Sequence, residues 1–394
     1  MGLSFLHGRI LMNALPNSAN RVQVSAAALR ANYRLMRGAL PADTPLLAMV
    51  KADGYGHGMI DATRAFTEAG CRHFGVAELP EAVRLREAGI AGEILVMAGP
   101  LPGQEAYFPR HGLSAAVFSI DSARLLSAAG TAAGRRVPVH IKVDCGMTRL
   151  GIMPEEVPVF AHAIERLPGI ELAGLFAHFP EADSPGKPSN QQVCDRFAEA
   201  SAALTTALAG APGLPSCRHL ANSAGILNLP MAHFDMARSG IALYGYAPDG
   251  VRAHAIINGE ALRPAMRFVS RVLQVKDVPA GRGVSYGHTF VTARPSRLAV
   301  LPVGYEDGYQ RALSNKASVL IHGRRAPVVG RVCMNLCLAD VTDIAAVAAG
   351  DEVVLLGSQG DEFIGADELA TQAGTISYEL LCMIGNNNQR EMLP

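Results

Sequence analysis

Residues 46–58 read Leu-Leu-Ala-Met-Val-Lys-Ala-Asp-Gly-Tyr-Gly-His-Gly, an apolar run followed by a lysine and a glycine-rich turn. The run from Leu46 to Val50 has the unbroken apolar character of a strand buried on both faces, which is typical of a parallel sheet. Lys51 then lies at the C-terminal edge of this strand, where α/β folds hold their chemistry. A lysine amine in a partly dry site has a lowered pKa and can form a Schiff base with an aldehyde. Lys51 is therefore a candidate nucleophile, whereas an isolated lysine at a strand end usually reaches solvent.

Apolar runs alternate with helical patterns along the first part of the chain. Repeated βα units of this kind indicate a parallel sheet, and eight of them predict a closed (β/α)₈ barrel of the TIM type. A doubly wound open sheet is the alternative, but no Gly-x-Gly-x-x-Gly fingerprint follows the first strand. The predicted strands are 46–50, 73–77, 93–98, 115–118, 137–143, 171–178, 219–222 and 234–237, with helices between them such as 79–88, 122–129, 154–167 and 190–208.

The pattern changes after Gly245, where short runs rich in β-branched residues are bounded by Gly, Pro, Asn or Asp. A mainly β C-terminal domain is predicted. We assign 26–247 to the barrel and 248–394, together with 1–25, to the β domain. The strand Arg21 to Ser25 joins the β domain because no barrel strand lies near it in sequence. The predicted strands of this domain are 268–275, 297–302, 317–322, 326–332 and 352–356.

Composition narrows the choice of partners. The 394 residues include 35 basic and 35 acidic side chains, which argues against nucleic acid or a charged membrane surface as a partner. Seven scattered cysteines, mostly in apolar strand-like contexts, indicate buried thiols in a reducing compartment. Cys333 and Cys337 lack the second pair that a zinc site requires, so no metal is expected. Neither a signal peptide nor an apolar run of about eighteen residues is present, and we expect a cytoplasmic protein.

Polar residues follow the predicted strands at their C-terminal ends, which a barrel brings together at one mouth. The loops 222–225 and 238–241 have the small residues and free backbone N–H groups that hold a phosphate. Together with Lys51 they predict pyridoxal 5′-phosphate, an aldehyde cofactor that carries a phosphate. The residues at the mouth are Lys51, Tyr55, Lys142, Asp144, Arg149, His178, Asp183, Asn222, Ser223, Arg238, Ser239 and Gly240.

Seven motifs in one order resemble those of bacterial alanine racemases, and the resemblance runs from about Arg21 to Ile384. Such a series is highly specific, although each motif alone is not. It implies an isomerase with a pyridoxal phosphate barrel and a β domain, which interconverts L-alanine and D-alanine, either to supply peptidoglycan precursors or to catabolise D-alanine. It also implies a head-to-tail homodimer, each site lying between one barrel and the partner's β domain. The motifs are VKADGYGHG (50–58), KVDCGMTRLG (142–151), ANS (221–223), RSGIALYG (238–245), VSYG (284–287), GYEDGY (304–309) and CM (333–334).

The resemblance implies a two-base mechanism. Lys51 is expected to act on the α-proton of the D-enantiomer, and Tyr286 of the partner subunit on that of the L-enantiomer. A tyrosine titrates near pH 10, so Tyr286 needs a cationic neighbourhood to act as a base, which His178 and Arg238 would supply. Arg238 would also face the pyridine nitrogen of the cofactor and leave it unprotonated, because a guanidinium does not give up its proton.

Other roles follow from the same resemblance. Lys142 matches a lysine that is N-carboxylated in many relatives and orients Arg149; a plain ion pair with Asp144 is the alternative. The substrate carboxylate would be held by Arg149 and the backbone at Met334. The expected cofactor ligands besides Lys51 and Arg238 are Tyr55, Asn222, Ser223, Gly240, Ile241 and Tyr378, and the expected entrance gate is Asp183, Tyr305, Arg311, Ile376 and Tyr378.

Two departures and three alternatives remain. Asn335 stands where most relatives have an aspartate, and the tail 386–394 lacks the usual Arg-Val-Pro-Arg ending. A racemase of broader range, for serine or longer side chains, would differ at the gate. A non-catalytic pyridoxal phosphate carrier would lack the β domain. A decarboxylase of the same barrel type is disfavoured by Arg238, since decarboxylation benefits from a protonated ring nitrogen.

Overall fold

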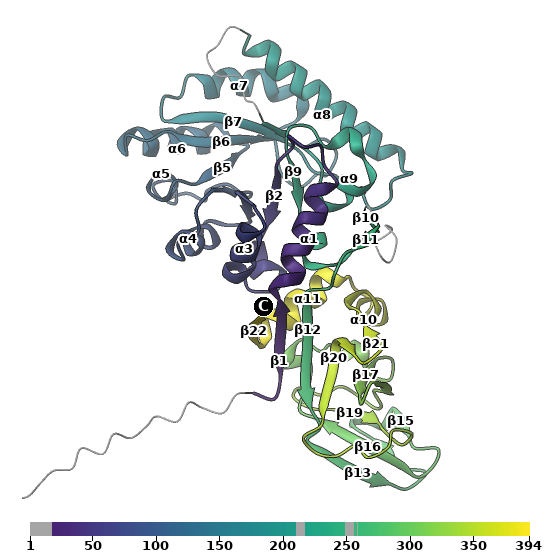
Figure 1. Ribbon diagram of the computed structural model, residues 1–394. Coiled ribbons are helices and arrows are strands. Elements are labelled where there is room, and N and C mark those ends of the chain that lie inside the picture. The colour runs from purple at the N-terminus through teal and green to yellow at the C-terminus, as the bar shows by residue number, and fades with distance from the viewer. Residues whose placement is uncertain (1–17, 210–216, 249–255, 258) are drawn as a thin grey trace, which may run out of the picture.

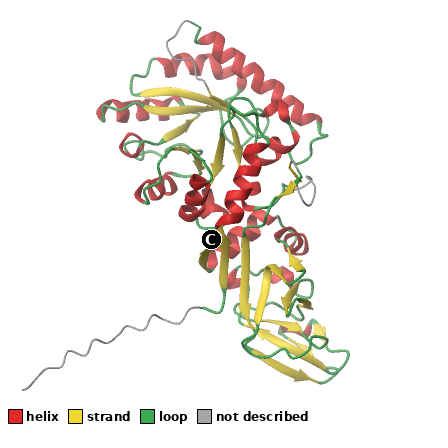
Figure 2. Ribbon diagram, in the orientation of Figure 1, coloured by secondary structure: helices red, strands yellow, loops and turns green. Residues whose placement is uncertain are grey.

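The computed structural model describes residues 18–209, 217–248, 256–257 and 259–394. A barrel with surrounding helices packs end to end on a smaller domain built mainly of sheets (Figure 1). Strands fill the inside of the first domain and helices its outside, whereas strands dominate the second (Figure 2). Of the segment 1–25 that we assigned to the β domain, residues 1–17 lie outside the described part.

Eight parallel strands form the barrel sheet, in the order β8-β7-β6-β5-β4-β3-β2-β9. A parallel bridge between His219 and Met236 links the two end strands and closes the ring. The prediction of a (β/α)₈ barrel followed by a mainly β domain is confirmed. The strands are β2 (Leu46–Met49), β3 (His73–Val76), β4 (Glu93–Val96), β5 (Ser114–Val117), β6 (Val137–Lys142), β7 (Ile170–Phe176), β8 (Cys217–His219) and β9 (Ala237–Ser239).

The outer helices follow ordinary sequence rules. In α1 the side chain of Ser25 accepts a hydrogen bond from the backbone N–H of Ala28 and caps the helix, while Leu29 and Met36 are fully buried on its inner face. The helices of this domain are α1 (Ala26–Gly38), α2 (Lys51–Tyr55), α3 (Met59–Glu68), α4 (Leu79–Glu87), α5 (Tyr107–His111), α6 (Ile120–Ala132), α7 (Val157–Glu165), α8 (Pro188–Ala207) and α9 (Ser223–Asn228).

The last two barrel strands differ from the predicted bounds 219–222 and 234–237. The seventh strand, β8, ends at His219, because Asn222 already caps helix α9 by accepting from the backbone N–H of Gly225 at 2.9 Å. The eighth, β9, begins only at Ala237, because Phe234 has a left-handed φ of 47°, which a strand does not accommodate. Arg238 and Ser239 therefore lie within a strand rather than after it.

The second domain has a seven-stranded sheet in the order β18-β17-β20-β12-β1-β22, with β21 beside β20, and a three-stranded sheet β13-β16-β19. The first strand, β1 (Arg21–Ser25), runs antiparallel to β12 and parallel to the last strand β22, which confirms that it pairs with this domain. The predicted strand 268–275 is wrong as one unit, since it divides into β12 and β13, which belong to different sheets. The bounds are β10 (Ile256–Ile257), β11 (Glu260–Ala261), β12 (Met266–Arg271), β13 (Gln274–Val278), β14 (Gly283–Val284), β15 (Phe290–Val291), β16 (Ser296–Leu301), β17 (Ser318–Ile321), β18 (Arg324–Pro327), β19 (Cys337–Asp340), β20 (Glu352–Gln359), β21 (Glu362–Ile364), α10 (Ala366–Ala373), α11 (Ser377–Asn387) and β22 (Gln389–Leu393).

Helix α11 lies where the two domains meet and packs against α2, directly beside the lysine turn. The beginning of α11 therefore contributes to the mouth of the barrel. Within the described ranges, no helix combines the length and the apolarity that crossing a membrane requires. The seven cysteines are free thiols.

Candidate active site

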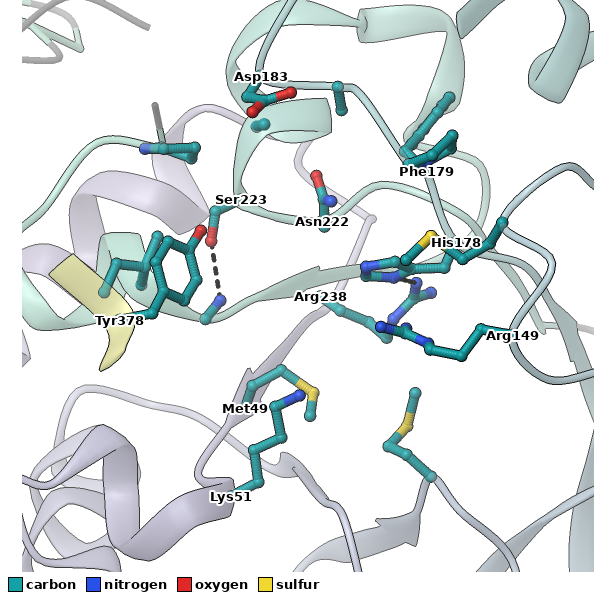
Figure 3. A pocket seen from close by; sticks show the side chains of 18 of the residues that line it. Met49, Lys51, Arg149, His178, Phe179, Asp183, Asn222, Ser223, Arg238 and Tyr378 are labelled. Atoms are coloured by element: carbon teal, nitrogen blue, oxygen red, sulfur yellow. Dashed lines mark hydrogen bonds between the residues drawn. The ribbon is translucent and has the colours of Figure 1, made fainter. Parts of the chain in front are cut away.

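A cavity of about 490 Å³ opens at the C-terminal ends of the barrel strands, a volume within the range of roughly 300–1,000 Å³ found for small-molecule sites. Lys51, Arg149, His178 and Arg238 turn toward the same space, and Ser223 and Tyr378 lie across it (Figure 3). The structure brings together these expected site residues: Lys51, Tyr55, Lys142, Arg149, His178, Asp183, Asn222, Ser223, Arg238, Gly240, Ile241, Ile376 and Tyr378.

Lys51 begins a short turn with unusual backbone geometry. Ala52, Asp53, Gly54 and Tyr55 all have positive φ values between 51° and 66°, so α2 is a left-handed turn. Left-handed dihedrals cost roughly 1–2 kcal/mol for each residue with a side chain, and such strain persists where surrounding contacts impose it. Burial, and then the positive charge of Arg149, lower the pKa of the Lys51 amine. A larger share of that amine is therefore neutral and able to accept a proton.

A cradle of small and hydroxyl-bearing residues lies on one side of the cavity. The hydroxyl oxygen of Tyr55 would be 2.4 Å from a Cβ at position 240, so only glycine fits there. The Gly240 N–H donates to Ser223 Oγ at 2.8 Å. The ring of Tyr55 stacks on that of Tyr244 with centroids 4.9 Å apart, which fixes its hydroxyl. The side chain of Asn222, by contrast, is engaged as the cap of α9.

Arg238 lies on the floor of the cavity with 3% of its surface exposed. Its guanidinium donates to the backbone carbonyl oxygens of Ala177, His219 and Leu220 at 2.8, 2.8 and 3.2 Å. Burial and the nearby charge of Arg238 hold the pKa of His178 well below its ordinary value. His178 is thus a neutral imidazole, and within this pair only Arg238 carries a positive charge.

Lys142 is a buried amine, 5% exposed, which donates a hydrogen bond to the carbonyl oxygen of Val143 at 3.1 Å. It does not pair with Asp144, the alternative that the sequence left open. The carboxylate of Asp144 instead accepts from four backbone N–H groups, those of residues 146–149, at 2.9 to 3.0 Å. Burial, and then the charge of Arg238, lower the pKa of Lys142 to about 7.

Four expected site residues lie away from this cavity, on the sheet domain: Tyr286, Tyr305, Arg311 and Met334. Tyr286 is 73% exposed and Met334 54%, high values for large apolar side chains. Ser285, just before Tyr286, has φ 61° and ψ −169°, a region otherwise used by glycine. Its hydroxyl donates to the carbonyl oxygen of Arg331 at 2.7 Å and holds the turn. Within one protomer, none of these four residues lines the cavity.

Two residues that support the site were not among those predicted. The ring of Phe176 stacks on that of His219 with centroids 4.8 Å apart and lies 5.5 Å from the guanidinium carbon of Arg238. His219 also accepts from Arg238 at 2.9 Å. Both lie inside predicted strands, where the sequence pattern indicates burial but does not show which side chains meet across the barrel.

A barrel that holds a buried lysine, a fixed arginine and a small-residue cradle at its mouth, joined to a β domain, defines a class of pyridoxal-phosphate-dependent isomerases. The chain belongs to the alanine racemase family. Residues 24–248 match the model described as alanine racemase, N-terminal domain, and residues 265–392 match alanine racemase, C-terminal domain.

Individual relatives agree with this assignment. The alanine racemase of Syntrophobacter fumaroxidans is 46% identical over 93% of this chain and 95% of its own length. The crystal structure of the Streptomyces lavendulae alanine racemase covers 97% of this chain and 98% of its own at 34% identity, with a TM-score of 0.89. That of Bartonella henselae, which has covalently bound pyridoxal phosphate, covers 96% of this chain and 100% of its own at 29% identity, with a TM-score of 0.84.

Proposed function

We propose that this protein interconverts L-alanine and D-alanine, using Lys51 of one protomer and Tyr286 of the partner subunit as the two acid–base groups. The observation that carries the proposal is the half-buried amine of Lys51, with its lowered pKa, at the edge of a cavity lined by Arg149 and Arg238. Removing a proton on one face of an amino acid and delivering one to the other requires a group on each face. Lys51 is such a group, and the second comes from outside this cavity.

The residues present fit pyridoxal phosphate. Four basic side chains, Lys51, Lys142, Arg149 and Arg238, line the cavity together with one carboxylate, Asp183, and the two arginines supply positive charge that suits a phosphate and a substrate carboxylate. Lys51 would hold the cofactor covalently, and Tyr55, Ser223, Gly240, Ile241 and Tyr378 would hold its phosphate. When bound, the cofactor supplies an electron sink that acidifies the substrate's α-proton. The narrow space at Gly240 supports a phosphate held close to the backbone.

Each side chain then has a defined task. Arg149 binds the substrate carboxylate through its forked N–H groups and so fixes which face of the substrate Lys51 meets. With D-alanine, the neutral amine of Lys51 accepts the α-proton and Tyr286 of the partner subunit delivers its hydroxyl proton to the opposite face. With L-alanine the two roles are reversed. Arg238 remains protonated throughout and keeps its hydrogen bonds to the carbonyl oxygens below it.

The exposed surface of the sheet domain supports a head-to-tail homodimer. Tyr286 follows the strained residue Ser285, is exposed, and does not line the cavity of its own protomer. In a head-to-tail pair, residues 26–247 of one protomer bind the cofactor, and the sheet domain of the other brings Tyr286, Met334 and the gate residues Tyr305 and Arg311 to the mouth. D-alanine supply for cell-wall precursors in the cytoplasm is the matching role.

Complementation between two inactive variants tests the two bases and the dimer together. Lys51→Ala and Tyr286→Phe are each expected to lose at least about 10²-fold in racemisation of alanine. Co-expressed with different affinity tags and purified as the mixed dimer, they leave one complete site and one doubly defective site. About half of the wild-type rate per mixed dimer is therefore expected.

The outcomes separate the alternatives. A mixed dimer without activity, although both parents bind the cofactor or retain their fold, would show that Tyr286 does not serve the partner's site. Assays with serine and lysine beside alanine test the broader substrate range. A wild-type protein that holds the chromophore but racemises none of the three would favour the carrier.

A further inference from the structure

A chain of polar side chains runs through the barrel from the N-terminal ends of its strands to the floor of the cavity. Glu93, at the start of β4, has Oε1 3.4 Å from His140 Nε2. His140 Nδ1 lies 2.9 Å from His219 Nε2. His219 Nδ1 in turn lies 2.9 Å from Arg238 Nη1. Four strands, β4, β6, β8 and β9, contribute one member each.

The direction of the hydrogen bonds that link Arg238, His219 and His140 follows from the chemistry of Arg238. A guanidinium only donates, so His219 Nδ1 accepts and carries no proton. Burial, and then the charge of Arg238, hold the pKa of His219 well below its ordinary value, so the ring is neutral and its proton lies on Nε2. This proton is donated to His140 Nδ1, which leaves the proton of a neutral His140 on Nε2, facing the Glu93 carboxylate. Both hydrogen bonds therefore point toward Glu93, and the His140 Nε2–H lies 3.4 Å from its carboxylate without completing a third.

Neighbouring residues pack closely around His140, His219 and Glu93 and hold these side chains in place. His140 and His219 are 2% and 0% exposed. A Cβ at position 174 would lie 2.3 Å from His140 Nδ1, so the imidazole occupies space that only a glycine leaves. The ring of Phe176 stacks on His219 at an interplanar angle of 7° and sets its plane. At the far end, His73 and Ser114 contact the carboxylate of Glu93.

We propose that Glu93, His140 and His219 are positioning residues that form a one-way polar relay to Arg238, with two hydrogen bonds and one charge contact, and fix the orientation and charge of its guanidinium. Arg238 forms no ion pair with any carboxylate in the described part of the chain. The relay is thus its link to a negative charge. A carboxylate 3.4 Å from His140 Nε2 polarises the imidazole and makes His140 Nδ1 a better acceptor, which in turn makes His219 Nδ1 a better acceptor for Arg238.

The consequence for the reaction rests on the proposed function. Held toward His219, the guanidinium is a weaker donor to whatever occupies its cavity side. Removing the charge of Glu93 would weaken the hydrogen bond between Arg238 and His219. Arg238 would then be a stronger donor to the pyridine nitrogen. A stronger electron sink would favour transamination, so the ratio of transamination to racemisation should increase.

The protonation pattern is tested first in cofactor-free protein labelled with [¹⁵N]histidine. Nitrogen NMR, with signals assigned through His140→Asn and His219→Asn, should show both rings neutral and protonated on Nε2. A proton on Nδ1 of either ring, or a doubly protonated ring, would overturn the relay. This measurement does not depend on any activity, so it remains informative even if the racemase assignment fails.

The functional arm uses the holoenzyme and the isosteric change Glu93→Gln, with His73→Gln as a matched control that removes a partner of Glu93 outside the relay. Glu93→Gln should shift the absorption maximum of the bound cofactor and raise the ratio of transamination to racemisation by about two- to tenfold. The control should leave both unchanged. A Glu93→Gln enzyme with the wild-type spectrum and ratio, or a control that changes equally, would contradict the proposal.

Discussion

Arg390, in the last strand of the chain, forms an ion pair with Asp53, two residues after Lys51. The same guanidinium donates to the carbonyl oxygens of Gly385 and Gly56 at 2.9 and 3.4 Å. The C-terminal strand and helix α11 thus hold the left-handed turn of Lys51 from outside the barrel. Although the tail lacks the ending common in its relatives, it makes specific contacts through Arg390.

Replacing Arg390 by glutamine should loosen this turn. We expect a loss of about 1–2 kcal/mol in the free energy of unfolding, because the ion pair is partly exposed and several hydrogen bonds are lost with it. The rate at which the cofactor dissociates should rise as well. Urea unfolding and the decay of the bound chromophore after dilution measure the two effects. Glu391→Gln, an exposed neighbour in the same strand, is the control; equal behaviour of the two variants would argue against the clamp.

Lys142 is expected to become N-carboxylated. Its pKa of about 7 leaves much of the amine neutral near pH 8, and a neutral amine adds carbon dioxide to form a carbamate while releasing one proton. The resulting anion would pair with Arg149 across the cavity. Protein equilibrated with [¹³C]bicarbonate should show a carbamate carbon signal by NMR that is absent from Lys142→Arg. Identical spectra for the two proteins, together with an unbranched lysine in crystals grown with bicarbonate, would exclude the modification.

His57 should make the fold sensitive to acid. Burial lowers its pKa from 6.5 to about 4, and Nε2 has no hydrogen-bond partner within the described structure. Between these two values the unfolded chain binds a proton that the folded chain does not, so stability falls as the pH drops from 6.5 toward 4. The expected loss is about 3 kcal/mol, at about 1.4 kcal/mol per pH unit. Urea unfolding of His57→Gln should depend less on pH in this window, whereas the exposed His162→Gln should follow the wild type.

Arg238→Glu should change the outcome of the reaction. A carboxyl group in place of the guanidinium can share a proton with the pyridine nitrogen, which strengthens the electron sink and increases transamination relative to racemisation. The ratio of pyridoxamine phosphate to racemised alanine over many turnovers measures this. If that ratio matched the wild type, the proposed role of Arg238 would be wrong.

The sequence predicted the barrel well because its strands are short apolar runs with regular spacing, as at Leu46 to Met49. It misplaced β9 because Phe234 looks like a strand residue, and its left-handed backbone is imposed by the surrounding fold. Most predicted site residues meet at the mouth because parallel strands converge there. The tautomers of His140 and His219 depend on contacts between distant strands, which no local pattern reveals.

The clamp on the lysine turn also has a consequence for synthesis of the chain. Arg390 and β22, which contact the strained residues 52–55, are synthesised after all the barrel strands. A growing chain on the ribosome can assemble barrel strands, but the turn that aims Lys51 lacks its outer support until Arg390 has been added. We therefore expect a chain ending at Asn388 to retain barrel helices by circular dichroism, yet to exchange the amide hydrogens of residues 51–58 far faster than the full-length protein. The geometry of the Lys51 turn would then depend on contacts with a segment more than 300 residues further along the chain.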